Sequence, residues 1–317
     1  MPAPYPRILV ARDFSACSER ALHTALDLAE RTGAEVHLLY AEVLHSDPFS
    51  ERQEQATPVE ELRRRVRQDG GGQPVGAERE VEIRTAVVRD IAAAPAIVRY
   101  AEEHGVDLIV MGTHGRRGVR RLLLGSVAEE VLAAAPCAVL TVREGDDPGA
   151  VEAVLVPVDF SEPSRRAIRR GQEMAALYGA ALHLVHVFEA APYPSFYGEE
   201  VISRREVPPH FAEEAEAQLR RMVEAESDAA DGGAADGVTF GVMAGQPFRQ
   251  IAAYARDHGV GLIVMGTRGL SGLQQVLLGS TAERTIRTAP CPVLVVKKTV
   301  RPDASAAPAE TAAAAPS

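Results

Sequence analysis

The residues most suited to binding chemistry lie in a glycine-spaced loop that occurs twice. Residues 110–126 read VMGTHGRRGVRRLLLGS, and residues 264–280 read VMGTRGLSGLQQVLLGS. Both have Gly-x-x-Gly, nine residues and Gly-Ser, at a constant offset of 154. Glycine lets backbone amides approach a ligand and permits a positive φ. The Gly-Ser pair opens a predicted helix, whose free amides and dipole favour an anion. The pattern therefore predicts a polyphosphate site in each half of the chain.

A ligand-free interpretation of the same loop stays open. Ser126 with Glu129, and Ser280 with Glu283, fit the S-x-x-E capping box, and glycines also mark tight turns. The loop is neither a Walker A motif nor GxGxxG. Repetition at unchanged spacing, with the intervening residues altered, favours a binding site over a purely structural turn.

Two aspartates form the second part of the candidate site. Asp13 and Asp159 each precede Phe-Ser at the end of the first predicted strand of a half. In a doubly wound sheet of order 3-2-1-4-5, the first and fourth strands are neighbours, which places Asp13 across a crevice from Gly112. A carboxylate there accepts hydrogen bonds from ribose or adenine. The alternative is a turn residue at the helix entry.

The elements that must position these residues alternate between strand and helix. In the first half, apolar strands are predicted at 8–11, 34–43, 80–88, 107–112 and 137–142. A helix capped by Ser15 ends at Gly33, a charged helical segment lies around 59–68, another helix ends at Gly105, and a further one begins at Ser126. This order predicts an α/β fold with a five-stranded parallel sheet, order 3-2-1-4-5, and helices on both faces.

The repeat divides the chain into two domains. The early parts of the copies are offset by 146 residues and the late parts by 154, so the second copy has 8 extra residues (154 − 146). We expect domains at 1–145 and 151–298, followed by a disordered Ala/Pro-rich tail at 299–317.

Composition excludes several classes of protein. The formal net charge of −10 argues against a general nucleic-acid binder. No apolar run reaches the roughly 18 residues of a membrane span, and the N-terminus lacks a secretory pattern. The three cysteines form no CxxC pair, so we expect a reduced, cytoplasmic protein in which Cys137 and Cys291 are buried core thiols.

Both halves resemble universal stress protein domains of the ATP-binding subgroup. That family's signature, Gly-x-x-Gly, nine residues and Gly-Ser/Thr, is met twice, and the resemblance extends to about Lys298. It implies two tandem Rossmann-like domains of the adenine nucleotide alpha hydrolase-like type. It also implies that the last strands, 137–142 and 291–296, pair with each other inside one chain. The family often has Gly-x-Pro before its third helix. The second copy has it at Gly245 and Pro247, but the first has Ile91 and Ala93, so that loop is expected to differ in shape.

The resemblance also implies which residues surround ATP. Asp13 and Asp159 would contact adenosine, Ala11 and Pro157 would line the base, and backbone atoms of two strand-end residues would meet the adenine edge. Ribose and phosphates would lie against the glycine loops. The full first set is Ala11, Asp13, Ala41, Met111, Gly112, Gly115, Arg116, Gly125, Ser126 and Val127. The second is Pro157, Asp159, Val187, Met265, Gly266, Gly269, Gly279, Ser280 and Thr281.

The sequence contains no convincing catalytic set and no metal-ligand spacing. His114 lies in the first loop, but its counterpart is Arg268, and the loops offer no carboxylate base. We therefore expect an ATP-binding sensor or regulator in the stress response, with Mg²⁺ arriving on the nucleotide. Expected partners are a second copy in a homodimer and a regulatory protein, with no nucleic acid or membrane. The alternatives are a slow ATPase, an enzyme phosphorylating its own Ser126 or Ser280, or a scaffold that binds no nucleotide.

The middle of the loop differs between the copies. Copy one has Arg116, Arg117, Arg120 and Arg121, whereas copy two has Gln274 and Gln275 in place of the last two. Four guanidinium groups would attract a triphosphate or, alternatively, form a solvated basic face.

Overall fold

The computed structural model describes residues 4–43, 64, 81–115, 124–146, 151–189, 207–226, 237–267 and 278–297. The first half contains β1 (Arg7–Arg12), α1 (Ala16–Thr32), β2 (Glu35–Val43), β3 (Ile83–Asp90), α3 (Ala93–Glu103), β4 (Leu108–Gly112), α4 (Ser126–Ala134) and β5 (Ala138–Val142). The second half contains β6 (Ala153–Pro157), α5 (Glu162–Tyr178), β7 (Ala181–Glu189), α6 (Pro209–Glu226), β8 (Val238–Gly245), α7 (Pro247–Asp257), β9 (Leu262–Gly266), α8 (Ser280–Thr288) and β10 (Val293–Val296). The expected helix at 59–68, apart from the helical Arg64, lies outside the described residues, as do Arg116, Gly269 and the tail at 299–317.

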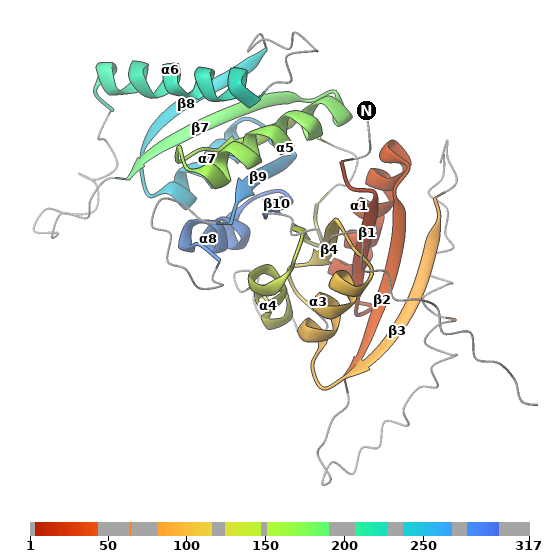
Figure 1. The fold of residues 1–317 in the computed structure, drawn as a ribbon. Helices are drawn as coiled ribbons and strands as arrows, with labels where there is room; N and C mark the ends of the chain where they lie inside the picture. Colours follow the sequence, from red (N-terminus) through yellow and green to blue (C-terminus); the bar gives the residue numbers. More distant parts are fainter. Residues whose placement is uncertain are drawn as a thin grey trace, which may run out of the picture.

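The two halves share one sheet of ten strands (Figure 1), in the order β3-β2-β1-β4-β5-β10-β9-β6-β7-β8. Each half has the predicted order 3-2-1-4-5 with parallel neighbours. β5 and β10 pair antiparallel at the centre, with Leu294 opposite Leu140. The predicted pairing of the last strands is therefore confirmed, and it merges the two five-stranded parallel sheets into one mixed sheet.

Helices cover both faces of the sheet, as the alternation of elements predicts. Ile8 and Val10 of β1 point into a core shared with α1, α5 and α6, and the intervening Leu9 points into a second core with α3, α4, α7 and α8. Adjacent strand residues face opposite sides because the side-chain period of a strand is two. Cys137 and Cys291 are free thiols buried in this second core, as predicted. Burial raises the pKa of each to about 12.

Local capping sets the ends of the first helix in each half. The Ser15 side chain accepts from the amide of Ser18, and Gly33 ends α1 with φ 71°. Ser161 and Gly179 do the same for α5. The predicted cap and stop of α1 are confirmed, and helix entry immediately after β1 keeps the first turn of α1 at the edge where the strands end.

Two cations join the halves across the central strand pair. Lys297 Nζ lies 3.1 Å from the carbonyl oxygen of Ala133 and 2.9 Å from that of Ala135, at the C-terminus of α4. Arg143, its counterpart at the 154-residue offset (297 − 143), donates to the carbonyl of Ile286 in α8 at 2.7 Å. A cation at a helix C-terminus satisfies free carbonyls and favours the helix dipole. Each half therefore caps a helix of the other.

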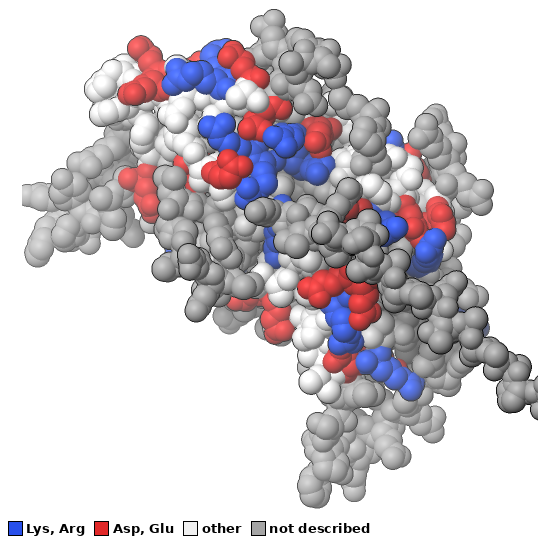
Figure 2. Space-filling model, viewed as in Figure 1, with Lys and Arg blue, Asp and Glu red and all other residues white. Residues whose placement is uncertain are grey.

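The surface carries both signs of charge. Figure 2 shows basic and acidic side chains interspersed on the face it presents. On α5, for example, Arg169 pairs with Glu226 of α6 at 2.6 Å. None of the helices in the described part of the chain is long and apolar enough to span a membrane.

Candidate functional site

The candidate site of the first half lies where β1 and β4 end. These strands are parallel neighbours, with Val10 opposite Val110, so Asp13 and the glycine loop leave the sheet at the same edge. A Cβ atom built on Gly115 would lie 2.5 Å from Oδ2 of Asp13. The predicted proximity of Asp13 to the loop is therefore found, and its nearest glycine is Gly115 rather than Gly112.

Space, rather than backbone conformation, is what requires glycine at these positions. Neither Gly112, Gly115 nor Gly125 has a positive φ, so that part of the sequence interpretation is wrong. A Cβ at Gly115 would press on the Asp13 carboxylate, and one at Gly125 would lie 3.1 Å from the carbonyl oxygen of Thr113. The two described ends of the loop therefore lie close to each other and to the aspartate.

Gly112 and Gly266 have a packing role that the sequence analysis missed. A Cβ on Gly112 would lie 2.7 Å from the Cβ of Cys17, and one on Gly266 would lie 2.7 Å from the Cβ of Pro163. Cys17 and Pro163 belong to the first turns of α1 and α5. A larger residue at the strand end would push this helix away, so these glycines hold the helix entry close to the site.

The aspartates also organise the helix entry, as the alternative interpretation expects. Oδ1 of Asp13 accepts from the amide of Ser15 at 3.0 Å and from its hydroxyl at 2.6 Å. Oδ1 of Asp159 accepts in the same way from Ser161, at 3.1 and 2.5 Å. The turn role is compatible with ligand binding in the first half, because Oδ2 of Asp13 is the oxygen that faces Gly115.

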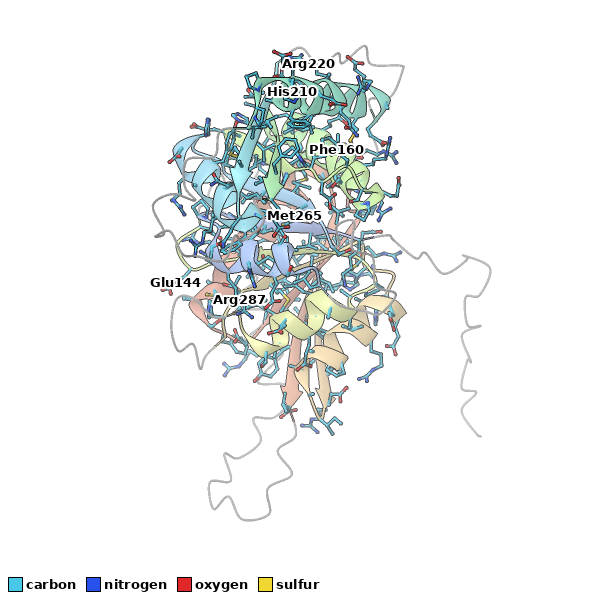
Figure 3. The ribbon with its side chains drawn as sticks, turned by 90° about the vertical axis from the view of Figure 1, so that its left-hand side faces the viewer. Glu144, Phe160, His210, Arg220, Met265 and Arg287 are labelled. Carbon is cyan, nitrogen blue, oxygen red and sulfur yellow. The ribbon has the colours of Figure 1, made fainter. Side chains whose placement is uncertain are left out.

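An unusual backbone follows each aspartate. Phe14 has φ 62° and Phe160 (labelled in Figure 3) has φ 64°, and these are the non-glycine residues with positive φ in the described part of the chain. A bulky side chain in this region costs about 1–3 kcal/mol, and such strain is found at functional sites. The rings pack against Tyr40 and His186, with centroid distances of 5.1 and 4.5 Å. The only signal in the sequence was the repeated Asp-Phe-Ser.

The helices that follow the loops begin without a side-chain cap. The N-cap residues are Gly125 and Gly279, and Ser126 and Ser280 are the first residues inside α4 and α8. The capping-box alternative is therefore wrong, because a serine in that box must occupy the N-cap position. The first-turn amides have no cap from a side chain, unlike those of α1 and α5. This end of the helix suits an anion.

Both loops close in the same way. The amide of Gly125 donates to the carbonyl of Thr113 at 2.8 Å, and the amide of Gly279 donates to that of Thr267 at 2.8 Å. The remaining expected residues lie along the same strand ends and helix starts. Ala11, Ala41, Pro157, Val187 and Thr281 are half-buried, Met111 and Met265 (Figure 3) are buried, and Ser126, Val127 and Ser280 are exposed.

The connection after the third strand differs between the halves, as predicted. Two residues, Ile91 and Ala92, separate β3 from α3, whereas Gln246 alone separates β8 from α7. The strand register places Asp90, rather than Ile91, level with Gly245, which has φ 141°. The hydrogen bond from Arg99 holds the pKa of Asp90 below its usual value. A charged pair thus takes the place of the Gly-x-Pro turn.

The described residues provide no cluster of three histidine, cysteine or carboxylate side chains that could bind a metal ion. Nδ1 of His114 lies 3.0 Å from Oγ1 of the neighbouring Thr113.

Comparison with known proteins agrees with this geometry. The profile described as "Universal stress protein family" matches residues 4–143 and 151–297, which is most of the chain. This chain belongs to the universal stress protein family. It is a tandem member, because each half matches the family separately.

Several curated universal stress proteins are similar to this one. Protein MJ0531 of Methanocaldococcus jannaschii is 33% identical over 148 residues, 46% of this chain and 81% of the relative. Protein Rv2005c of Mycobacterium tuberculosis is 26% identical over 229 residues, 71% of this chain and 72% of the relative. A crystal structure of a universal stress protein from Archaeoglobus fulgidus has a TM-score of 0.63 at 22% identity, covering 92% of this chain and 98% of that one. That likeness supports the tandem universal stress protein fold.

Proposed function

We propose that this universal stress protein is a nucleotide-dependent sensor or regulator that binds one ATP in each half. The observation that carries the proposal is the convergence at Gly115, where Asp13 Oδ2 lies within 2.5 Å of a Cβ position that only glycine leaves empty. The uncapped N-terminus of α4 begins at the same strand edge. A carboxylate for the nucleoside and free amides for phosphates are the groups that ATP requires.

In each half, different residues would contact the nucleoside and the phosphates of ATP. In the first half, Asp13 would accept from ribose hydroxyls, and the amides of Ser126 and Val127 would face the phosphates. Asp159 and the amides of Ser280 and Thr281 would do the same in the second half. Mg²⁺ would arrive bound to the phosphates, and its charge would reduce their repulsion.

A regulatory role fits the chemistry of the site better than rapid hydrolysis does. The described residues of the loops contain no carboxylate, and His114 of the first loop is replaced by Arg268 in the second, so the halves share no general base and binding alone gives little acceleration. Exposure of Ser126 and Ser280 supports self-phosphorylation as the second candidate. Incubation with labelled ATP followed by intact-protein mass measurement separates the two functions.

Calorimetric titration with Mg·ATP tests the proposal. We expect saturation at two nucleotides per chain, because both halves have the aspartate turn and an uncapped helix. Saturation at one nucleotide per chain would mean that one half does not bind, and the altered connection after β3 would point to the first half. No binding heat under several buffers, together with no nucleotide released from the purified protein, would refute the proposal.

The expected partners remain part of this proposal. The ten-stranded sheet already pairs the two last strands within the chain, so a homodimer would use another surface. A regulatory protein partner would respond to the bound nucleotide. The assignment to the cytoplasm stays a prediction from the sequence.

A further inference from the structure

Each half contains a cluster of two histidines and a tyrosine that nucleotide binding does not use. The clusters lie on the α3 and α7 side of the sheet, away from the glycine loops. Each joins a strand histidine to the end of the helix that covers it. The members are His37, Tyr100 and His104 in the first half and His183, Tyr254 and His258 in the second.

The two clusters have nearly the same geometry. Nδ1 of the strand histidine lies 3.0 Å from the tyrosine hydroxyl in both, for His37 with Tyr100 and for His183 with Tyr254. The tyrosine stacks on the second histidine with a centroid distance of 3.8 Å in both. The two histidine rings are 5.9 Å apart in the first half and 5.8 Å apart in the second.

The hydrogen bonds identify where an added proton would go on the helix histidine. Nδ1 of His258 lies 3.0 Å from the carbonyl oxygen of Tyr254, which can only accept. Nδ1 therefore holds the proton of the neutral ring, and Nε2 carries the lone pair. His104 has the same arrangement, with Nδ1 2.9 Å from the carbonyl oxygen of Tyr100.

The surroundings of the strand histidine differ between the halves. Nε2 of His37 lies 3.1 Å from Oε1 of Glu35, which also pairs with Arg84 of β3. At the 146-residue offset, Glu35 corresponds to Ala181 (35 + 146).

The described residues around His183 provide no carboxylate contact. Its neighbours in register are Leu155 of β6 and Thr239 of β8, and α7 contributes the titratable Tyr254 and His258. A protonated His37 would therefore lie beside the carboxylate of Glu35, whereas a protonated His183 would lie beside a second histidine, His258.

Acid therefore works against folding in these clusters. Burial lowers the pKa of His37 although Glu35 raises it, and burial together with His258 lowers the pKa of His183. The unfolded chain protonates histidine near pH 6.5, so it binds protons first. The stability contributed by the neutral rings is complete above that pH and is lost as the pH falls towards the lower folded values.

We propose that the His183–Tyr254–His258 cluster is a pH-responsive latch, which releases α7 from β7 in mild acid, and that the ion pair of His37 with Glu35 makes α3 respond less. Two cationic rings 5.8 Å apart, with no carboxylate contact among the described residues, repel each other and disturb the stacking of Tyr254 on His258. Gln246 alone connects β8 to α7, and a hinge would form there, next to Gly245 at the end of β8, which has φ 141°. If the proposed nucleotide function holds, acid would open the second ATP site first.

Hydrogen exchange measured by mass spectrometry at pH 7.5 and 5.5 tests the latch without nucleotide. Exchange is divided by the intrinsic rate at each pH, and α7 is compared with α3 in the same molecule. We expect acid to increase the exchange of α7 about tenfold more than that of α3, which corresponds to about 1.4 kcal/mol. Equal responses of the two helices would overturn the proposal.

Matched variants are obtained by giving each half the residue that the other half has at the position of Glu35 and Ala181. Ala181 is exposed, so Ala181→Glu can supply the missing carboxylate without filling a core position. This variant should reduce the acid response of α7 to that of α3, and Glu35→Ala should transfer the response to α3. His183→Gln, which cannot be protonated, should lose most of the response. An unchanged acid response in α7 of Ala181→Glu, or in His183→Gln, would refute the latch.

Discussion

At the scale of single residues, the proposed binding of ATP in the first half depends on how closely Asp13 approaches Gly115. Gly115→Ala should weaken ATP binding at that site about tenfold, or about 1.4 kcal/mol, because the new methyl group displaces Oδ2. Gly145→Ala is the matched control, since nothing lies within 4 Å of a Cβ there. Calorimetry should show one weakened site in the first variant and wild-type binding in the second. Wild-type binding in both variants would mean that Asp13 does not contact the nucleotide.

At the scale of elements, helix ends connect the two halves. Lys297→Met keeps most of the side-chain stem but removes the cation that caps α4, so we expect a loss of about 0.3–2 kcal/mol in the free energy of unfolding. Arg143→Met should have a similar effect through α8, because the two caps are equivalent. Arg221→Met, on the exposed surface of α6, controls for loss of charge alone. Urea unfolding measures all three, and equal stability would exclude a role for the caps.

At the scale of the whole molecule, the central strand pair has a consequence for assembly. β5 and β10 pair with each other at the centre of the ten-stranded sheet, so neither is available to pair with a second chain. We therefore expect a dimer of this chain to form through another surface. Light scattering is expected to give about twice the chain mass of 33.9 kDa. Dilution should separate the copies without changing far-ultraviolet circular dichroism, since each chain retains its own ten-stranded sheet. A mass of one chain at all concentrations would discard the homodimer but not the internal pairing.

The sequence alone determined the repeat, the element order and the edge of the sheet that carries the aspartate and the glycine motif. These depend on local signals: Ser15 and Gly33 bracket a helix with their own backbone bonds, and apolar strands alternate with helices in both copies. Parallel strands joined by helices then admit few topologies, which is why the order 3-2-1-4-5 could be predicted.

Only the tertiary structure decided which groups meet. The approach of Asp13 to Gly115, the contact of Gly112 with Cys17, and the cap that Lys297 places on α4 join residues far apart in the sequence. Such contacts leave no periodicity, because they depend on how whole elements pack. The capping box failed for the same reason: S-x-x-E predicts a cap at Ser126, but the chain enters α4 one residue earlier, at Gly125, where the loop closes onto Thr113.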